Sequence, residues 1–208
     1  MPTKIFFKNN EIQNISNHIK GRKTLLVTSN GFVKRGLVDK IKSLNENIVA
    51  IFTDIQPNPE FKELETCYDQ IHQKKFELIL AIGGGSVIDA AKYFSVFNQE
   101  KEAKYVSEIT KGKIEKILYK TVPIIAVPTT AGTASELTPW ATIWDNDEKK
   151  KYSLHLPELF PQIALYDPSL TLSVPRDITI QTGLDTLSHA LESIWNKNAN
   201  IITIGHAI

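Results

Sequence analysis

Short apolar runs alternate with amphipathic stretches over roughly the first 130 residues of the chain. Between the runs, apolar residues recur at three- and four-residue intervals, which is typical of helices. The runs that predict strands are 24–28, 47–52, 78–82 and 124–127, and the stretches that predict helices are 32–44, 60–74 and 86–97. Strands that alternate with helices in this way form a parallel sheet with helices on both faces. The sequence therefore predicts a Rossmann-like α/β fold.

The pattern changes further along the chain. Residues 99–121 are polar and are expected to form a surface excursion or a short helix. Segments 141–144 and 151–154 flank an acidic turn and predict a hairpin, and 163–166 predicts a further strand. After Pro175 no strand pattern is found, and a helix is expected over the second half of 179–195.

We therefore divide the chain into an α/β domain, residues 1–175, and the start of an all-helical domain, residues 176–208. About thirty residues are too few to bury a core of their own. We expect the chain to be cut short relative to its functional form.

Composition narrows the class of protein. Of 208 residues, 42% are apolar and 23% charged, which allows a packed core, and the net charge of +1 argues against a nucleic-acid or anionic-membrane binder. The single cysteine, Cys67, cannot form an internal disulfide, so a cytoplasmic location is expected. The start of the chain has no signal-peptide pattern, and no apolar stretch approaches the length of a membrane-spanning helix.

A run of three glycines, Gly83, Gly84 and Gly85, follows the predicted strand 78–82 directly. Glycine allows positive φ and lets the backbone approach a ligand closely, and a helix N-terminus offers unpaired N–H groups that suit a pyrophosphate. Ser86 is expected to cap the helix, with Asp89 completing a capping-box-like pair. A tight strand-to-helix turn with an ordinary cap would explain these residues equally well. Neither a Walker loop nor the Gly-x-Gly-x-x-Gly spacing is present.

A second polar loop, residues 128–136, follows the predicted strand 124–127 and includes Thr129, Thr130 and Ser135. Parallel strands end at one edge of a sheet, where open α/β sheets bind their ligands. One such loop would be explained by a hydroxyl-rich turn that caps a helix. Two loops at the same edge favour a nucleotide crevice.

Asp185 and His189 stand four residues apart in a stretch with helical spacing, which places them on one helix face, one turn apart. A carboxylate and an imidazole together suit iron(II), zinc, manganese or nickel. A helix-cap carboxylate and a buried histidine are the alternative interpretation. A catalytic ion needs at least one more ligand, and we expect the remaining ligands beyond Ile208 rather than at His206.

Other side chains complete these expectations. Leu184, Leu187 and Leu191 are expected to form an apolar wall beside the Asp185–His189 pair. His18 and His72 lie beside apolar stripes and are expected to be partly solvated.

Together these motifs resemble the iron-containing alcohol dehydrogenase family (group III) over essentially the whole chain. The motifs that carry the likeness are Pro57-Asn58-Pro59, Gly83-Gly84-Gly85-Ser86 with Asp89 and Lys92, Pro128-Thr129-Thr130 through Ser135-Glu136, Asp167-Pro168, and Gly183-Leu184-Asp185 with His189. The resemblance implies an N-terminal dinucleotide-binding α/β domain, a C-terminal helical domain, and an active site between them.

The resemblance also implies roles for individual residues. The predicted cofactor-binding residues are Gly83, Gly84, Gly85 and Ser86 at the pyrophosphate, with Asp89 in the same motif, Thr129, Thr130 and Ser135 along the cofactor cleft, and Lys151 near the nicotinamide ribose. Asp185 and His189 would be two of four metal ligands, and no sequence feature here matches the other two. The implied cofactors are NAD or NADP and a divalent metal, iron(II) or zinc.

The implied activity of the complete protein is metal-dependent, NAD(P)H-linked interconversion of an aldehyde and a primary alcohol. The partners are then a small-molecule substrate and further copies of the chain in a homo-oligomer, with no nucleic acid or membrane. We expect residues 1–208 alone to have negligible activity. Segments 138–145, 149–154 and 191–196 resemble the phosphonoacetaldehyde reductase branch, which makes 2-hydroxyethylphosphonate in phosphonate biosynthesis.

Several alternatives stay open. Polyol or sugar-phosphate dehydrogenases and dehydroquinate-synthase-like enzymes belong to the same superfamily. A non-catalytic nucleotide-binding module or a degenerate scaffold would lack catalysis. Many family members carry an aspartate that bonds the adenosine ribose, but residues 27–30 offer no clear equivalent, so NADP or relaxed cofactor choice becomes a hypothesis, with Asp54 as the competing candidate.

Overall fold

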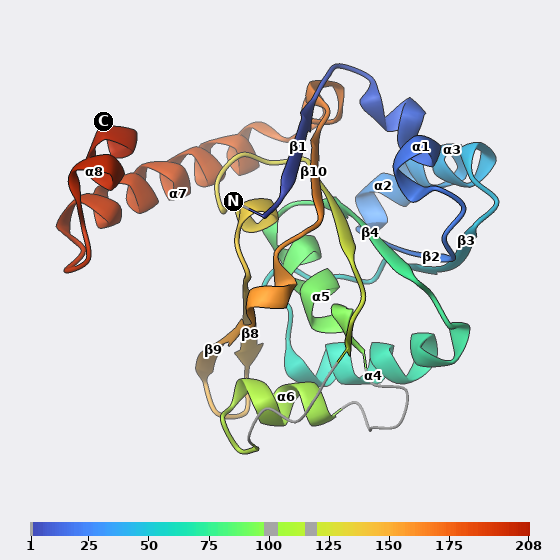
Figure 1. Cartoon of the computed structure of the whole chain (residues 1–208), viewed down its shortest axis with the longest axis horizontal. Helices are drawn as coiled ribbons and strands as arrows, with labels where there is room; N and C mark the ends of the chain where they lie inside the picture. The colour runs from blue at the N-terminus through green and yellow to red at the C-terminus, as the bar shows by residue number, and fades with distance from the viewer. Residues whose placement is uncertain (1, 98–103, 115–119) are drawn as a thin grey trace.

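The protein is built around a six-stranded sheet in which every neighbouring pair of strands is parallel (Figure 1). The computed structural model describes residues 2–97, 104–114 and 120–208. In spatial order the strands are β1 (Lys4–Phe7), β10 (Ile163–Tyr166), β7 (Ile124–Pro128), β4 (Leu78–Gly83), β2 (Thr24–Thr28) and β3 (Ile48–Phe52). The α/β sequence prediction is confirmed.

Alternate residues of the central strands point to opposite faces of the sheet, and both faces are buried. Leu25 and Val27 join one apolar core, whereas Leu26 joins the other. The first core is covered by α4 (Phe61–Ile71) and α5 (Gly85–Ser95). The second is covered by the 3-10 turn η1 (Glu11–Asn14), α1 (Ile15–Ile19) and α3 (Leu37–Leu44). Burial on both faces explains why these strands read as continuous apolar runs.

An antiparallel hairpin, β8 (Trp140–Asp145) and β9 (Lys150–His155), packs against the α5 side of the molecule. Its inward residues Ala141, Ile143 and Leu154 join the first core. Helix α6 (Lys104–Thr110) packs beside β9, and β5 (Val96–Phe97) pairs with β6 (Lys120–Thr121). The hairpin prediction is confirmed, and α6 is the short helix expected within 99–121, a segment of which 99–103 and 115–119 lie outside the described residues.

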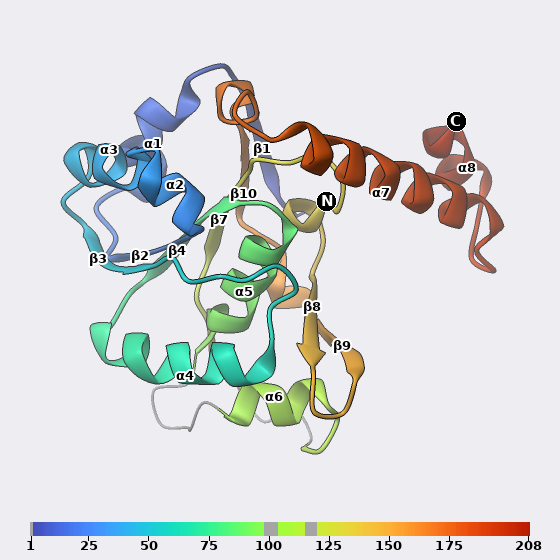
Figure 2. The same ribbon diagram turned by 180° about the vertical axis from the view of Figure 1, so that it is seen from behind.

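Two helices end the described chain, α7 (Arg176–Trp195) and α8 (Ile201–Ala207), and both project from the α/β body (Figures 1 and 2). Helix α7 covers the whole of the segment in which a helix was expected only over the second half. Leu184, Leu187 and Leu191, the residues of the expected apolar wall, are 60%, 55% and 41% exposed, so in the described chain this wall faces solvent. Nowhere in the described residues is there a helix with the length and apolarity needed to cross a membrane.

Several local predictions are corrected. The helix expected over 32–44 is two helices, α2 (Asn30–Lys34) and α3, because Gly36 adopts a φ of 74° and breaks the helical path. The helix expected to run to Phe97 ends at Ser95, where β5 begins. His18 is buried rather than partly solvated: its Nε2 lies 3.2 Å from Glu11 Oε1, and Phe6 packs edge-on against its ring. The side chain of His72 lies outside the described part of the structure.

Three more 3-10 turns connect these elements: η3 (Ser135–Leu137) precedes the hairpin, η4 (Pro157–Leu159) follows it, and η5 (Pro168–Leu170) follows β10. The turn η2 (His72–Lys74) completes the helical stretch expected over 60–74.

Candidate nucleotide cleft and metal half-site

A cleft of about 490 Å³ lies where the strands of the sheet end. Its walls come from the segments that follow β2, β3, β4 and β7 and from the first turns of α7. Along the chain, β2 leads to β3 at one edge, and the path then crosses back to β4 on the other side of β2. Open α/β sheets bind ligands at such a reversal of strand order, outside the carboxyl ends of the strands.

The floor of the cleft is the start of α5. Gly84 is the N-cap residue, and Gly84, Gly85 and Ser86 all line the cleft. The first N–H groups of any helix lack intrahelical partners and carry partial positive charge, so this floor suits a phosphate or pyrophosphate. A β-carbon on Gly84 would stand 3.0 Å from Thr130 Oγ1, and one on Gly85 would stand 2.7 Å from Thr133 Oγ1. The glycines are thus needed for close approach of the 128–136 loop. Positive φ is not the reason, because Gly83, Gly84 and Gly85 all lie outside that region.

The predicted capping box is absent. Helix α5 begins at Gly85 with no side-chain cap bond, and Ser86 Oγ instead accepts a hydrogen bond from Asn58 N at 3.2 Å. The carboxylate of Asp89 accepts hydrogen bonds from Ser135 Oγ and Thr142 N. The capping prediction was wrong because Ser135, in the 128–136 loop, and Thr142, in β8, donate to the Asp89 carboxylate instead.

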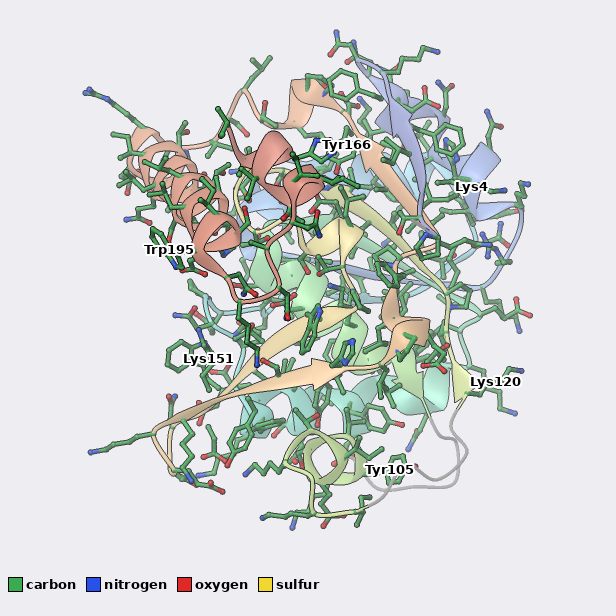
Figure 3. All side chains as sticks on the ribbon, turned by 60° about the vertical axis from the view of Figure 1, so that its left-hand side comes forward. Lys4, Tyr105, Lys120, Lys151, Tyr166 and Trp195 are labelled. Carbon is green, nitrogen blue, oxygen red and sulfur yellow. The ribbon has the colours of Figure 1, made fainter. Side chains whose placement is uncertain are left out.

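The structure divides the sequence-predicted cofactor residues into two groups. Gly84, Gly85, Ser86, Thr129 and Thr130 line the cleft together. The other four do not line it. Asp89 and Ser135 are hydrogen-bonded to each other behind the cleft wall, and Gly83 packs against Val87. Lys151 is exposed on the hairpin, with its Nζ 5.9 Å from the centre of the Trp144 ring. Figure 3 shows Lys151 on the same side of the molecule as Trp195 at the end of α7.

The sequence interpretation missed the cationic end of the cleft. Arg35 lines it, is exposed, and stacks over the Phe32 ring at 4.3 Å. No Asp or Glu is among the described residues that line the cleft. Asp54, the alternative ribose-binding candidate, is exposed and does not itself line the cleft, but it stands at its margin: Ile55 and Gln56 line the cleft, and Asp54 Oδ1 accepts a hydrogen bond from Gln56. The position of Arg35, at the C-terminal end of α2, the first helix after β2, was the available signal.

Asp185 and His189 lie on one face of α7, as their spacing predicts, with His189 Nε2 3.6 Å from Asp185 Oδ1. Their side chains are 40% and 52% exposed, so both are accessible to an ion. Within residues 2–97, 104–114 and 120–208, no group of three or more His, Cys, Asp and Glu side chains could hold a metal. The pair therefore fits as two ligands of a divalent ion and no more.

The cleft and the Asp185–His189 pair are neighbours along α7. Ile178, Gln181 and Thr182 line the cleft, and Asp185 follows Thr182 by three residues. Gly132, in the loop that follows β7, lies against both Thr182 and Asp185. Neither Asp185 nor His189 is among the described residues that line the cleft, and His189 instead lines a separate hollow with residues of the α7–α8 connection. A ligand in the cleft therefore ends about one helical turn before Asp185. His155 lies apart from this region, stacked on Trp140 with the ring centres 3.8 Å apart, and His206 is exposed on α8.

Comparison of the sequence with known proteins identifies the family of the chain. The sequence profile of the family described as iron-containing alcohol dehydrogenase matches residues 2–168. The chain is 32% identical over 220 residues to the aldehyde-alcohol dehydrogenase of Streptococcus pneumoniae serotype 4, and 32% identical over 216 residues to the 1,3-propanediol dehydrogenase of Citrobacter freundii. All of this chain is covered in both cases, but only 25% of the first relative and 55% of the second.

Solved structures agree with the sequence matches. The sulfoacetaldehyde reductase of Bifidobacterium kashiwanohense, in complex with NAD+, superposes with a TM-score of 0.88 at 31% identity, covering 99% of this chain and 55% of that one. The NADH-dependent butanol dehydrogenase A of Thermotoga maritima gives a TM-score of 0.85 at 27% identity, covering 99% and 52%. The chain belongs to the iron-containing alcohol dehydrogenase family. It spans about half the length, or less, of these relatives.

Proposed function

We propose that this chain supplies the nucleotide-binding lobe and two metal ligands of an NAD(P)H-dependent oxidoreductase that interconverts an aldehyde and a primary alcohol. The observation that carries the proposal is that Thr182, which lines the cleft, lies one helical turn before Asp185 on the helix that also carries His189. Residues 1–175 form the dinucleotide-binding domain and residues 176–208 begin the helical, metal-binding domain. The single cysteine is compatible with a cytoplasmic enzyme.

Each part of the site then has a defined task. The N-terminus of α5 binds the pyrophosphate, and Thr129 and Thr130 line the wall beside it. Asp185 and His189 hold iron(II), or zinc, through one carboxylate and one imidazole. The ion, when bound, supplies Lewis-acid polarisation of the carbonyl oxygen. A bound nicotinamide would supply the hydride, and the chain's own contribution would be to hold the dinucleotide in the cleft beside α7.

The cofactor we propose is NADP. In dinucleotide folds an acidic residue beyond the strand bonds the 2′-hydroxyl of NAD, whereas an arginine accommodates the 2′-phosphate of NADP. Here Ser29 follows β2, Arg35 lies in the cleft, and the described lining contains no carboxylate that would repel the extra phosphate.

The substrate we propose is a short aldehyde that carries an anionic head group, with phosphonoacetaldehyde as the specific candidate. Support comes from the resemblance of segments 138–145 and 149–154 to that branch and from the structural similarity to a sulfoacetaldehyde reductase, since sulfonate and phosphonate are both compact tetrahedral anions.

Two measurements test this function. Calorimetric titration of the chain with NADPH and NADH is expected to show binding, tighter for NADPH; absence of binding to either would exclude the proposal. Asp185→Ala and His189→Ala in the complete protein are expected to abolish both iron content and phosphonoacetaldehyde reduction. Asp177→Ala, which removes an exposed carboxylate from the first turn of the same helix, is the control and should retain both.

The same variants separate the rival functions. If the protein is a non-catalytic nucleotide-binding module, none of the three variants should differ from the unmutated protein in iron content, and none should show reductase activity. A polyol or sugar-phosphate dehydrogenase, or an enzyme of the dehydroquinate-synthase type, predicts the same loss of metal but turnover with a different substrate panel.

A further inference from the structure

A lysine ammonium group is completely buried behind the wall of the cleft. Lys92, on α5, has 0% of its surface exposed. Its Nζ donates to Ser135 O and Ser135 Oγ, both at 2.7 Å, and to Trp140 O at 2.5 Å. An ammonium has three donors, so these contacts satisfy it fully. Burying a charge is costly unless it is paired and hydrogen-bonded, which points to a specific purpose for this lysine.

Asp89 completes the arrangement from one turn earlier on the same helix. Its Oδ1 lies 4.0 Å from Lys92 Nζ and accepts a hydrogen bond from Ser135 Oγ at 2.6 Å, while its Oδ2 accepts one from Thr142 N at 3.0 Å. The Ser135 hydroxyl therefore accepts from Lys92 and donates to Asp89. Burial raises the pKa of Asp89 and lowers that of Lys92 to about 8, and each group opposes the shift of the other.

This Lys92–Ser135–Asp89 bridge connects three elements that meet at the cleft. Helix α5 carries the phosphate-binding floor at its N-terminus, Ser135 ends the loop that forms the facing wall, and Trp140 and Thr142 begin the hairpin. None of the three residues of the bridge is among the described residues that line the cleft. Any effect it has on a bound nucleotide must pass through the loop.

The loop depends on outside restraint. Ala134, next to Ser135, adopts a φ of 50°, a left-handed conformation that costs a non-glycine residue about 1 kcal/mol or more. Ser135 N donates to Thr133 Oγ1 at 3.3 Å, and Thr133 packs directly over Gly85 in the cleft floor. Fixing Ser135 therefore fixes the threonine that faces the pyrophosphate site.

We propose that Lys92 and Asp89 are positioning residues for the nucleotide cleft, which hold the 128–136 loop at the distance from the α5 N-terminus that bound pyrophosphate requires. This inference rests on the proposed function of the cleft as a nucleotide site. It differs from a purely structural role because nucleotide affinity, and not only stability, depends on the bridge.

The test compares two buried serines whose hydroxyls make hydrogen bonds, Ser135 at the centre of the bridge and Ser95 at the C-terminal end of α5. Ser135→Ala removes the centre of the bridge. Ser95→Ala removes a hydroxyl that donates to Val122 O at 2.6 Å, and Ser95 is also buried. Asp89→Asn is the second bridge variant: it removes the charge that balances Lys92 and turns an amide donor toward either Thr142 N–H or the Ser135 hydroxyl. Thermal unfolding and NADPH titration well below each melting temperature are measured for all three.

Ser95→Ala loses one neutral buried hydrogen bond and Ser135→Ala loses two that involve Lys92 and Asp89, so the melting temperature should fall in both variants and fall further in Ser135→Ala. The dissociation constant for NADPH should rise about tenfold or more in Ser135→Ala and Asp89→Asn, a change of about 1.4 kcal/mol, and stay within about twofold in Ser95→Ala. If the unmutated chain binds NADPH and the bridge variants bind it equally well, or if Ser95→Ala weakens binding as much as they do, the inference is overturned while the proposed function stands. If the unmutated chain binds no nucleotide, both are overturned.

Discussion

Gly132 lies so close to Asp185 that a β-carbon at position 132 would stand 3.3 Å from the carboxylate Oδ2 and 2.9 Å from the backbone oxygen of Thr182. The loop after β7 therefore meets helix α7 between the candidate nucleotide cleft and the candidate metal ligands. On the loop side this contact is made by glycine backbone, so the absence of a side chain at position 132 allows the loop to approach α7 this closely.

The first prediction uses two glycines of opposite environment. Gly132→Ala forces the loop away from α7 and is expected to destabilise the chain by about 1–3 kcal/mol through overpacking. Gly183, in the interior of α7, has no atom within 4 Å of an added β-carbon. Gly183→Ala should therefore stabilise the chain by about 0.5–1 kcal/mol, since alanine is the better helix former. Urea unfolding of both variants measures the difference, and equal effects of the same sign would contradict the close contact.

The second prediction concerns the choice of cofactor. Arg35→Gln is expected to raise the dissociation constant for NADPH about tenfold or more, because a charge-assisted hydrogen bond to phosphate contributes roughly 1.5–3 kcal/mol, while the constant for NADH changes little. Lys34→Gln is the matched control: Lys34 is an exposed neighbour that does not line the cleft. Equal loss of NADPH and NADH binding in Arg35→Gln would argue against a 2′-phosphate contact.

The sequence predicted the central strands and the shared position of the two polar loops because both follow from local pattern. Buried parallel strands read as apolar runs, and the register pairs Gly83 with Pro128, so the residues that follow them necessarily emerge side by side. The helical spacing of Asp185 and His189 likewise fixed their juxtaposition without knowledge of the fold.

Local pattern failed where distant residues decide the outcome. Asp89 looked like a capping residue, but Ser135 and Thr142, some fifty positions away, take its carboxylate. His18 was predicted to be partly solvated, but Phe6 packs edge-on against its ring. Phe6 belongs to β1, an exposed edge strand that the hydrophobic pattern did not predict. The cofactor- and metal-binding roles assigned to the site residues stay predictions, because they concern bound ligands and the fold does not test them.

A third prediction follows from the exposed side of α7. Ile180, Leu184, Leu187 and Leu191 recur at helical spacing and are all more than two-fifths exposed, which makes a continuous apolar stripe. We expect the chain to self-associate through this stripe as its concentration rises. Sedimentation velocity should show a shift toward monomer in the double variant Leu184→Glu/Leu187→Glu. The control variant Thr186→Glu adds one charge at an exposed polar position between them, and a similar shift there would assign the effect to net charge alone.

The fourth prediction uses Asp167, which joins the end of β10 to the start of the chain. Burial opposes its ionisation, but hydrogen bonds from Ser169, Ile12 and Asn10 outweigh that effect and hold the pKa of the carboxyl below its ordinary value. Because the folded-state pKa is depressed, the stabilisation is complete above the unfolded value of about 3.9 and is lost as the pH falls below it. Asp167→Asn should cost about 2–3 kcal/mol at pH 7, where amide hydrogens face backbone donors. Its melting temperature should also fall less steeply below pH 4 than that of the unmutated chain. An acid limb as steep as that of Asp177→Asn, in which an exposed aspartate is replaced, would show that Asp167 is not the group that titrates.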